Sequence, residues 1–318
     1  CDDRLKEIEA AGLLRQLRNW EASDTRTIQF QGRACAAEAA AASSRRRELL
    51  NFSSNDYLGL SADARVRGAF QACPGELGGA TASRLMTGNH ANYELLENEL
   101  ARFKQMEAAL VFTSGYVTAL GVIPALVGDG DFIVMDKLSH ACLVDGARLS
   151  GAIIRVYPHN NLKRCEELLE RCRSQAGSQA KVLLITESVF SMDGDLAPLH
   201  DLAELKRKHG AWLMVDEAHG TGVMGKNGRG GAEHFGVEKE VDISQGTLSK
   251  AFGCVGGFVC GSHSLKKFLV NRARSLIYST GLPPALCRVA TVAVRLARED
   301  SSFRKKLWEK TVYLLKIL

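Results

Sequence analysis

The sequence predicts an α/β protein whose mostly parallel sheet is covered by helices. Short apolar runs alternate along the chain with stretches whose apolar residues recur at helical spacing. Near-continuous apolar strands separated by helices are typical of a parallel sheet that is buried on both faces. The expected strands are residues 108–112, 131–136, 152–157, 181–187, 211–216 and 256–261, with a further strand that ends near Thr247.

Helices are expected between these strands and at both ends of the alternating region. Tyr93, Leu96, Leu100 and Phe103 follow one another at steps of 3, 4 and 3, which marks one face of a helix. Further helices are expected at residues 162–173 and 199–210, from about residue 283 onward, and at the end of the chain.

We expect three parts along the chain. Residues 1–50 form an N-terminal segment of helix and loop, and residues 51–284 form a large domain that holds the sheet. Residues 285–318 begin a C-terminal small domain, which is expected to be truncated.

The composition is that of a globular protein without an extreme charge balance. Of 318 residues, 46% are apolar and 24% are charged, and the net charge of +5 is spread along the chain, so we expect no nucleic-acid partner. No apolar run reaches the length of a membrane span, and the first residues lack the apolar region of a signal peptide. The nine cysteines include no CxxC pair, which favours reduced thiols in a cytoplasmic compartment and argues against a metal site.

Polar side chains follow directly after one of the apolar runs. In AWLMVDEAHGTGV (211–223), the apolar residues end in Asp216, Glu217 and His219, and glycines follow. Ligands of parallel sheets lie outside the carboxyl ends of the strands, so Asp216 and His219 stand where chemistry is expected. Taken alone, Asp216 also fits a turn cap and His219 a packed structural residue.

Three other strand ends carry groups that suit a phosphorylated ligand. Lys250 lies among glycines and hydroxyl residues in GTLSKAFG, where an apolar environment would lower the pKa of its amine. In VFTSGYVTAL a strand ends and a helix begins, and backbone N–H groups at such a helix start bind anions. His140 follows a third strand. Singly, these features also fit a surface lysine, an ordinary N-cap and a packed histidine.

Together, the four strand ends match the needs of pyridoxal phosphate. The aldehyde of this cofactor requires a lysine amine, and its ring nitrogen requires a carboxylate. Its phosphate requires N–H and hydroxyl donors. The sequence therefore predicts a pyridoxal phosphate site at the carboxyl edge of the sheet.

The longer motifs around these residues resemble one enzyme family. DEAHGTGVMGKNGRG and GTLSKAFG are similar to the motifs of the α-oxoamine synthases, which are fold-type I pyridoxal phosphate enzymes. The resemblance covers nearly the whole chain and implies a fold-type I transferase. It includes NFSSNDYLGL (51–60), ASRLMTGNH (82–90), TSGY (113–116), DKLSHACLVDGARLSGA (136–152) and TESVFSMDGDLAPL (186–199).

The resemblance implies a role for each matching residue. Lys250 would hold the cofactor covalently and later act as acid and base, Asp216 would pair with the ring nitrogen, and His219 would bond the phenolic oxygen. His140 would stack on the ring. Further cofactor contacts are expected from Ser114, Gly115, Tyr116, Thr247 and Ser191.

Three more residues are assigned by resemblance outside this group. Thr280 is similar to a residue that reaches the phosphate of a partner subunit, which implies a homodimer with shared sites. Arg15 and Asn55 are expected to bind substrate, although Arg15 fits a solvated helix face equally well.

The resemblance also implies an activity. NFSSNDYLGL together with ARSLIYSTGLPP (273–284) favours the family member that condenses L-alanine with pimeloyl-CoA or pimeloyl-carrier protein in biotin synthesis. Carbon dioxide and the free thiol would be released with the amino ketone. Members that use glycine with acetyl-CoA or succinyl-CoA, and serine palmitoyltransferase, stay as alternatives, because the cofactor residues do not separate them.

The sequence departs from the family pattern at two points, and three other classes of protein are disfavoured. Ala119 stands where the family often has asparagine, and the arginine that commonly grips the amino-acid carboxylate is expected beyond residue 318. A non-catalytic family member is disfavoured because Lys250 is present. A serine hydrolase and a nicotinamide dehydrogenase are disfavoured because GxSxG and a GxGxxG after the first strand are absent.

Overall fold

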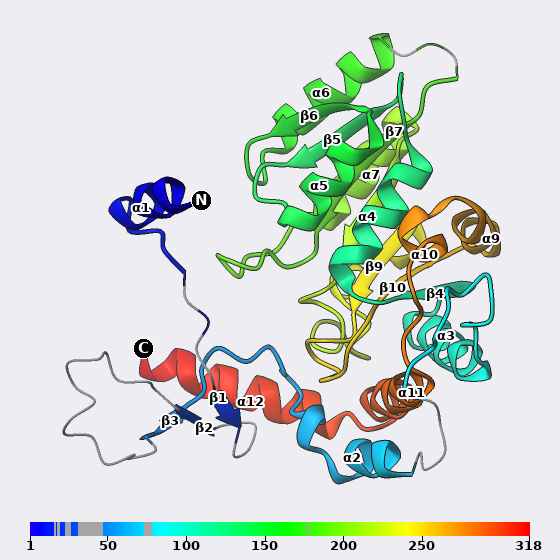
Figure 1. The fold of residues 1–318 in the computed structure, drawn as a ribbon. Coiled ribbons are helices and arrows are strands. Elements are labelled where there is room, and N and C mark those ends of the chain that lie inside the picture. The colour runs from blue at the N-terminus through cyan, green and yellow to red at the C-terminus, as the bar shows by residue number, and fades with distance from the viewer. Residues whose placement is uncertain are drawn as a thin grey trace. The chain divides into compact units, whose positions relative to one another are not determined.

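The computed structural model describes most of the chain as two compact units. These are Cys1–Ser54 and Asn55–Leu318, and each is considered by itself (Figure 1). The described residues are 1–15, 17, 20–22, 27–30, 47–72, 78–175, 177 and 179–318.

The first unit contains a helix and a small antiparallel sheet. Helix α1 (Asp2–Ala10) buries none of its residues. Strands β1 (Trp20–Ala22), β2 (Thr27–Phe30) and β3 (Arg47–Leu50) pair in that order. The sequence predicted only helix and loop here, because strands of three or four residues are too short to show a clear alternation. The predicted domain boundaries after residues 50 and 284 stay a prediction.

The second unit is built on a seven-stranded sheet in the order β4-β10-β9-β8-β7-β5-β6. The pairs β9–β8, β8–β7, β7–β5 and β5–β6 are parallel, whereas β10 runs antiparallel to both of its neighbours. The predicted α/β class with a mostly parallel sheet is thus confirmed. The strands are β4 (Ala108–Phe112), β5 (Phe132–Asp136), β6 (Ile153–Tyr157), β7 (Val182–Glu187), β8 (Trp212–Asp216), β9 (Ile243–Thr247) and β10 (Gly257–Gly261).

Helices follow most of these strands, as the periodicity predicted. The longer ones are α2 (Ala64–Gln71), α3 (Ala91–Lys104), α4 (Gly115–Leu126), α5 (Ala141–Ser150), α6 (Leu162–Gln175), α7 (Leu199–His209), α9 (His263–Arg272), α11 (Pro284–Glu299) and α12 (Ser302–Ile317). Short helical turns are η1 (Leu60–Ala62), α8 (Gly231–His234), η2 (Glu238–Glu240) and α10 (Arg274–Ile277).

The sheet is buried on both faces because successive strand residues point to opposite sides. Ile133 joins the core cluster formed with α4 and α5, whereas the next residue, Val134, joins the cluster formed with α6 and α7. A third cluster packs α3 and α11 around Leu100 and Phe258. This packing makes the carboxyl edge of the sheet a rigid support for the loops that follow it.

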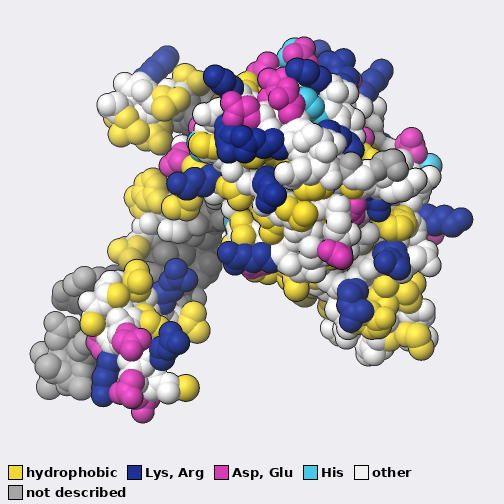
Figure 2. Space-filling model, turned by 90° about the horizontal axis from the view of Figure 1, so that it is seen from above, with side chains coloured by type: hydrophobic (Ala, Val, Ile, Leu, Met, Phe, Trp, Pro, Cys, Tyr) yellow, Lys and Arg dark blue, Asp and Glu magenta, His cyan; other side chains and the backbone are white. Residues whose placement is uncertain are grey.

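The surface carries charges of both signs. Figure 2 shows basic and acidic side chains interspersed on the visible face. Among the described residues, each helix is too short or too polar to cross a bilayer.

Candidate active site

A cavity of about 240 Å³ lies at the carboxyl edge of the sheet. The parallel strands β5, β7, β8 and β9 all end at this edge, so side chains from distant parts of the sequence meet there. Eight of the predicted site residues line the cavity: Ser114, Gly115, Tyr116, His140, Asp216, His219, Thr247 and Lys250.

Asp216 is the last residue of β8, and its carboxylate is almost fully buried. The Ala218 N–H donates to Oδ1 and the Gln245 Nε2 donates to Oδ2, each at 2.9 Å. Burial nevertheless raises the pKa of Asp216, because two hydrogen bonds do not replace full hydration. A cationic group in the cavity would therefore stabilise the Asp216 carboxylate.

Lys250 and His219 are in hydrogen-bond contact and both line the cavity. Lys250 Nζ lies 2.7 Å from His219 Nε2, and on the other side of the ring the Tyr57 hydroxyl lies 2.7 Å from Nδ1. The Tyr57 hydroxyl also donates to Asn55 Oδ1 at 3.1 Å. If that hydroxyl proton goes to Asn55, the Tyr57 oxygen accepts from Nδ1–H, and Nε2 is the acceptor for the amine.

Burial shifts the pKa values of this pair toward neutral forms. It lowers the pKa of His219 to about 4, with further contributions from the charges of Lys250 and His140. It also lowers the pKa of Lys250, against the opposing charges of Asp216 and Glu187. An amine with a lowered pKa is a better nucleophile and base at neutral pH.

The start of α4 forms another wall of the cavity. Ser114 is the N-cap, and its Oγ accepts the Val117 N–H at 3.1 Å. A Cβ on Gly115 would come within 3.2 Å of the Thr247 Cβ, and a Cβ on Gly257 would lie 2.4 Å from the Gly115 nitrogen. These glycines allow β9, β10 and the helix start to approach closely, which leaves N–H and hydroxyl donors facing the cavity.

His140 and Tyr116 lie on the remaining side. Their ring centroids are 6.5 Å apart in an edge-to-face arrangement. His140 is the N-cap of α5, and its Nδ1 accepts the Cys142 N–H at 3.2 Å. The Tyr116 hydroxyl donates to Asp145, which lies in α5.

The remaining predicted residues lie outside this cavity. Ser191 is exposed in the loop after β7, and Thr280 is exposed and pairs through its backbone with Ser83. Asn55 contacts the cavity only through Tyr57. Arg15 is exposed and belongs to the first unit, so its predicted role stays a prediction. Ala119, where the family often has asparagine, is buried within α4 and does not line the cavity.

Sequence reasoning did not single out Glu187, Gln245 or Tyr57. Glu187 and Gln245 line the cavity, and Tyr57 orients His219. Tyr57 lies inside the quoted motif NFSSNDYLGL, so its signal was present in the sequence. Glu187 ends an expected strand, but its pairing with Asp216 depends on the sheet order. Glu217, by contrast, lies outside the cavity lining and accepts the Gly231 and Ala232 N–H groups at the start of α8.

The donor set fits pyridoxal phosphate. A buried carboxylate that a cation would stabilise, an amine with a lowered pKa, and hydroxyl and N–H donors at a helix start share one cavity. These are the three groups that the ring nitrogen, the aldehyde and the phosphate require.

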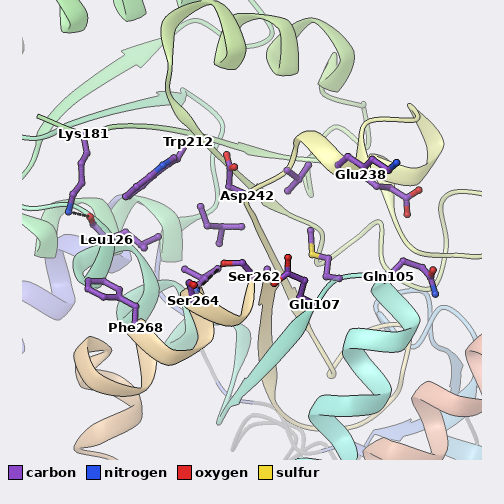
Figure 3. Close-up of a pocket in the computed structure, with 16 residues that line it drawn as sticks. Gln105, Glu107, Leu126, Lys181, Trp212, Glu238, Asp242, Ser262, Ser264 and Phe268 are labelled. Atoms are coloured by element: carbon purple, nitrogen blue, oxygen red, sulfur yellow. Dashed lines mark hydrogen bonds between the residues drawn. The ribbon is translucent and has the colours of Figure 1, made fainter. Parts of the chain in front are cut away.

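A larger cavity, of about 650 Å³, lies at the opposite edge of the sheet (Figure 3). Polar groups that line it are hydrogen-bonded within the protein: Lys181 donates to the Leu126 carbonyl, and Glu107 accepts the His263 N–H. None of the predicted site residues lines it.

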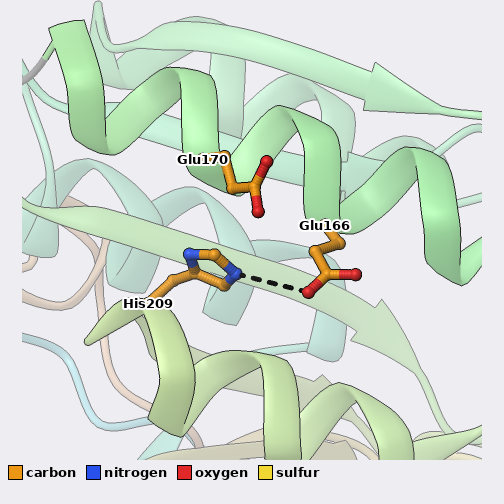
Figure 4. A group of neighbouring side chains, drawn as sticks. All are labelled: Glu166, Glu170 and His209. Carbon is orange, nitrogen blue, oxygen red and sulfur yellow. Dashed lines mark ion pairs between the residues drawn. The ribbon is translucent and has the colours of Figure 1, made fainter.

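A group of potential metal ligands, Glu166, Glu170 and His209, joins α6 and α7 (Figure 4). The Lys208 ammonium lies 2.5 Å from Glu166 Oε1. His209 Nε2 lies 3.9 Å from the same oxygen. Since the ammonium already neutralises Glu166, we assign no metal to this group.

The aminotransferase class I and II family matches residues 47–318. The chain belongs to this family. It is 45% identical over 312 residues to the 8-amino-7-oxononanoate synthase of Pelobacter propionicus, a match that covers 97% of this chain and 75% of that protein.

Solved structures agree with membership of the aminotransferase class I and II family. The serine palmitoyltransferase of Sphingomonas wittichii is 32% identical with a TM-score of 0.85, over 97% of this chain and 74% of that chain. A serine palmitoyltransferase of S. paucimobilis, solved with pyridoxal phosphate and myriocin, is 28% identical with a TM-score of 0.83, over the same shares. The predicted resemblance to α-oxoamine synthases and the fold-type I class are confirmed.

Proposed function

We propose that this chain catalyses the pyridoxal phosphate-dependent condensation of L-alanine with pimeloyl-CoA or pimeloyl-carrier protein. The products are 8-amino-7-oxononanoate, the free thiol and carbon dioxide. The observation that supports a pyridoxal phosphate-dependent reaction is that Lys250, His219 and Asp216 line one cavity. The 45% identity to a named 8-amino-7-oxononanoate synthase, against 32% to a serine palmitoyltransferase, favours these substrates.

The chain's own residues would divide the work as follows. When bound, pyridoxal phosphate supplies an aldehyde that captures amines and a ring that draws electrons from the substrate carbon. Asp216 would hold a negative charge against the ring nitrogen. Lys250 Nζ would take the proton from the substrate Cα and later return one. Such a positioned general base typically contributes about 10² to 10⁴ in rate.

His219 would keep the Lys250 amine in place before the cofactor arrives, while burial lowers the pKa of that amine. The His219 Nε2 lies within hydrogen-bond distance of Nζ, and the Tyr57 contact at Nδ1 fixes the ring. The N–H groups at the start of α4, with Ser114 and Thr247, would bind the phosphate. His140 would stack on the ring.

Thr280 is the residue that we propose reaches a partner subunit. This residue is exposed and does not line the cavity of its own chain. We propose that it contacts the phosphate site of a second copy, which makes the enzyme a homodimer with shared sites. The enzyme would act in the cytoplasm on L-alanine and a pimeloyl thioester.

The test is a Lys250→Ala variant of the full protein. We expect normal folding by circular dichroism, loss of the absorbance band of lysine-bound cofactor, and loss of carbon dioxide release from L-alanine and pimeloyl-CoA. Product formation at the wild-type rate would refute the assignment of Lys250.

A further inference from the structure

Glu187 is a buried carboxyl group in the cavity wall that no part of the proposed mechanism uses. It is the last residue of β7, only 3% exposed, and the register partner of Asp216 on β8. Side chains at paired positions of neighbouring strands point to the same side of the sheet. Both carboxyl groups therefore face the same cavity.

Glu187 also makes a specific contact with the opposite wall. Its Oε1 accepts the backbone N–H of His140 at 2.5 Å. His140 is the N-cap of α5, so this bond fixes the backbone from which the imidazole ring projects. The ring is held a second time by the Cys142 N–H at Nδ1.

We propose that Glu187 is a positioning residue of the cofactor site, whose uncharged carboxyl group anchors the His140 backbone and leaves Asp216 as the single negative charge against the ring. This inference rests on the proposed function, because it assigns a role to the ring that Asp216 and His140 would contact. It predicts that the amide of glutamine can replace the Glu187 side chain and that alanine cannot.

The charges around Glu187 support an uncharged carboxyl group in the cofactor-free protein. Burial raises the pKa of Glu187 to about 8, and the nearby carboxylates of Asp216 and Asp136 add to this effect, whereas Lys250 and the His140 N–H oppose it. Asp216 receives two hydrogen bonds where Glu187 receives one. Glu187 has fewer hydrogen bonds to stabilise its charged form, so it is the carboxyl group that we expect to hold a proton.

The experiment compares Glu187→Gln, Glu187→Ala and the control Asp242→Asn. Asp242 also accepts a strand backbone N–H, that of Leu213 at 2.8 Å, but at the opposite edge of the sheet. The first readout is the dissociation constant of pyridoxal phosphate for the cofactor-free full protein, measured by absorbance titration. We expect Glu187→Gln and Asp242→Asn to stay within about threefold of wild type, and Glu187→Ala to bind about ten- to a hundredfold more weakly.

The second readout is the pH dependence of the melting temperature without cofactor. The unfolded Glu187 carboxyl ionises near its ordinary pKa of 4.5 and the folded one near 8, so the contribution of Glu187 to stability is lost as the pH rises through this interval. Glu187→Gln should lack that loss, and Asp242→Asn should retain it. This readout distinguishes a buried proton from a merely structural hydrogen bond.

Two results would overturn the inference. One is a Glu187→Ala protein that binds the cofactor as wild type does, and the other is a Glu187→Gln protein that binds it as weakly as Glu187→Ala. Both outcomes are independent of substrate turnover. A wild-type protein that binds pyridoxal phosphate but releases no carbon dioxide would refute the proposed reaction and leave Glu187 open to the same test.

Discussion

At the scale of single residues, the cavity holds charges that cost stability without a cofactor. Asp216 is buried with a raised pKa, and Lys250 is partly buried with a lowered one. Neither shift helps the empty protein fold, since each reflects a charged form that has lost hydration. Such strain at a cavity is a recurring mark of functional sites.

Replacement of Asp216 by asparagine tests this cost. Asparagine can still accept the Ala218 N–H, so we expect the cofactor-free variant to melt at the same or a higher temperature than wild type above pH 6. Turnover should fall by at least about 10²-fold, because the charge against the ring nitrogen is lost. Differential scanning calorimetry and carbon dioxide release measure the two effects. A large fall in both would assign Asp216 to folding rather than to the cofactor.

His219 should make the cofactor-free protein sensitive to mild acid. Its folded pKa is lowered to about 4 from an ordinary value of 6.5, so the unfolded chain binds a proton that the folded chain does not. The contribution of His219 to stability is then complete above pH 6.5 and declines as the pH falls toward 4. A His219→Gln variant should lose stability less steeply over that interval in calorimetric scans. Parallel curves for the two proteins would contradict the burial of a neutral imidazole.

At the scale of elements, the approach of β10 to the start of α4 shapes the end of the cavity where we propose that the phosphate binds. A Cβ on Gly257 would lie 2.4 Å from the backbone of Ser114 and Gly115. A Gly257→Ala substitution must therefore shift the helix start. We expect a loss of about 1–3 kcal/mol in stability and a weaker affinity for pyridoxal phosphate.

Gly68→Ala provides the matched control for Gly257→Ala. Gly68 lies inside helix α2, where an added Cβ meets no atom within 4 Å. Alanine there should raise the free energy of unfolding by about 0.5–1 kcal/mol and leave cofactor affinity unchanged. Equal effects of the two substitutions in denaturant titrations would refute the role of the close approach.

The sequence predicted strand positions well because buried strands are long apolar runs. It did not predict that β10 runs antiparallel, since the apolar run 256–261 reads alike in either direction. β10 runs antiparallel to β9 because the link between Thr247 and Gly257 is too short for the helical crossover that parallel strands need.

At the scale of the whole molecule, the sheet order brings together residues that the sequence keeps far apart. His140 and Lys250 are 110 positions apart and line one cavity, because β5 and β9 end at the same edge. Lysine, aspartate and histidine were predictable from motifs around each strand end. Glu187 was not, because its importance depends on the neighbouring strand that places Asp216 beside it.

The sequence predicts a second copy only through the resemblance that assigns Thr280 to the phosphate site of a partner subunit. Thr280 and Ser191 do not line the cavity of their own chain. We expect sedimentation equilibrium to give a dimer, and a Thr280→Ala variant to keep that dimer while it binds pyridoxal phosphate more weakly. A monomeric enzyme with full activity would contradict shared sites.

Substrate choice tests the central claim most directly. The full protein, loaded with pyridoxal phosphate, would be assayed for carbon dioxide release with three pairs: L-alanine with pimeloyl-CoA, glycine with acetyl-CoA, and L-serine with palmitoyl-CoA. We predict the highest kcat/KM for L-alanine with pimeloyl-CoA, and none for any pair in the Lys250→Ala variant. A clear preference for glycine or L-serine would contradict the proposed reaction.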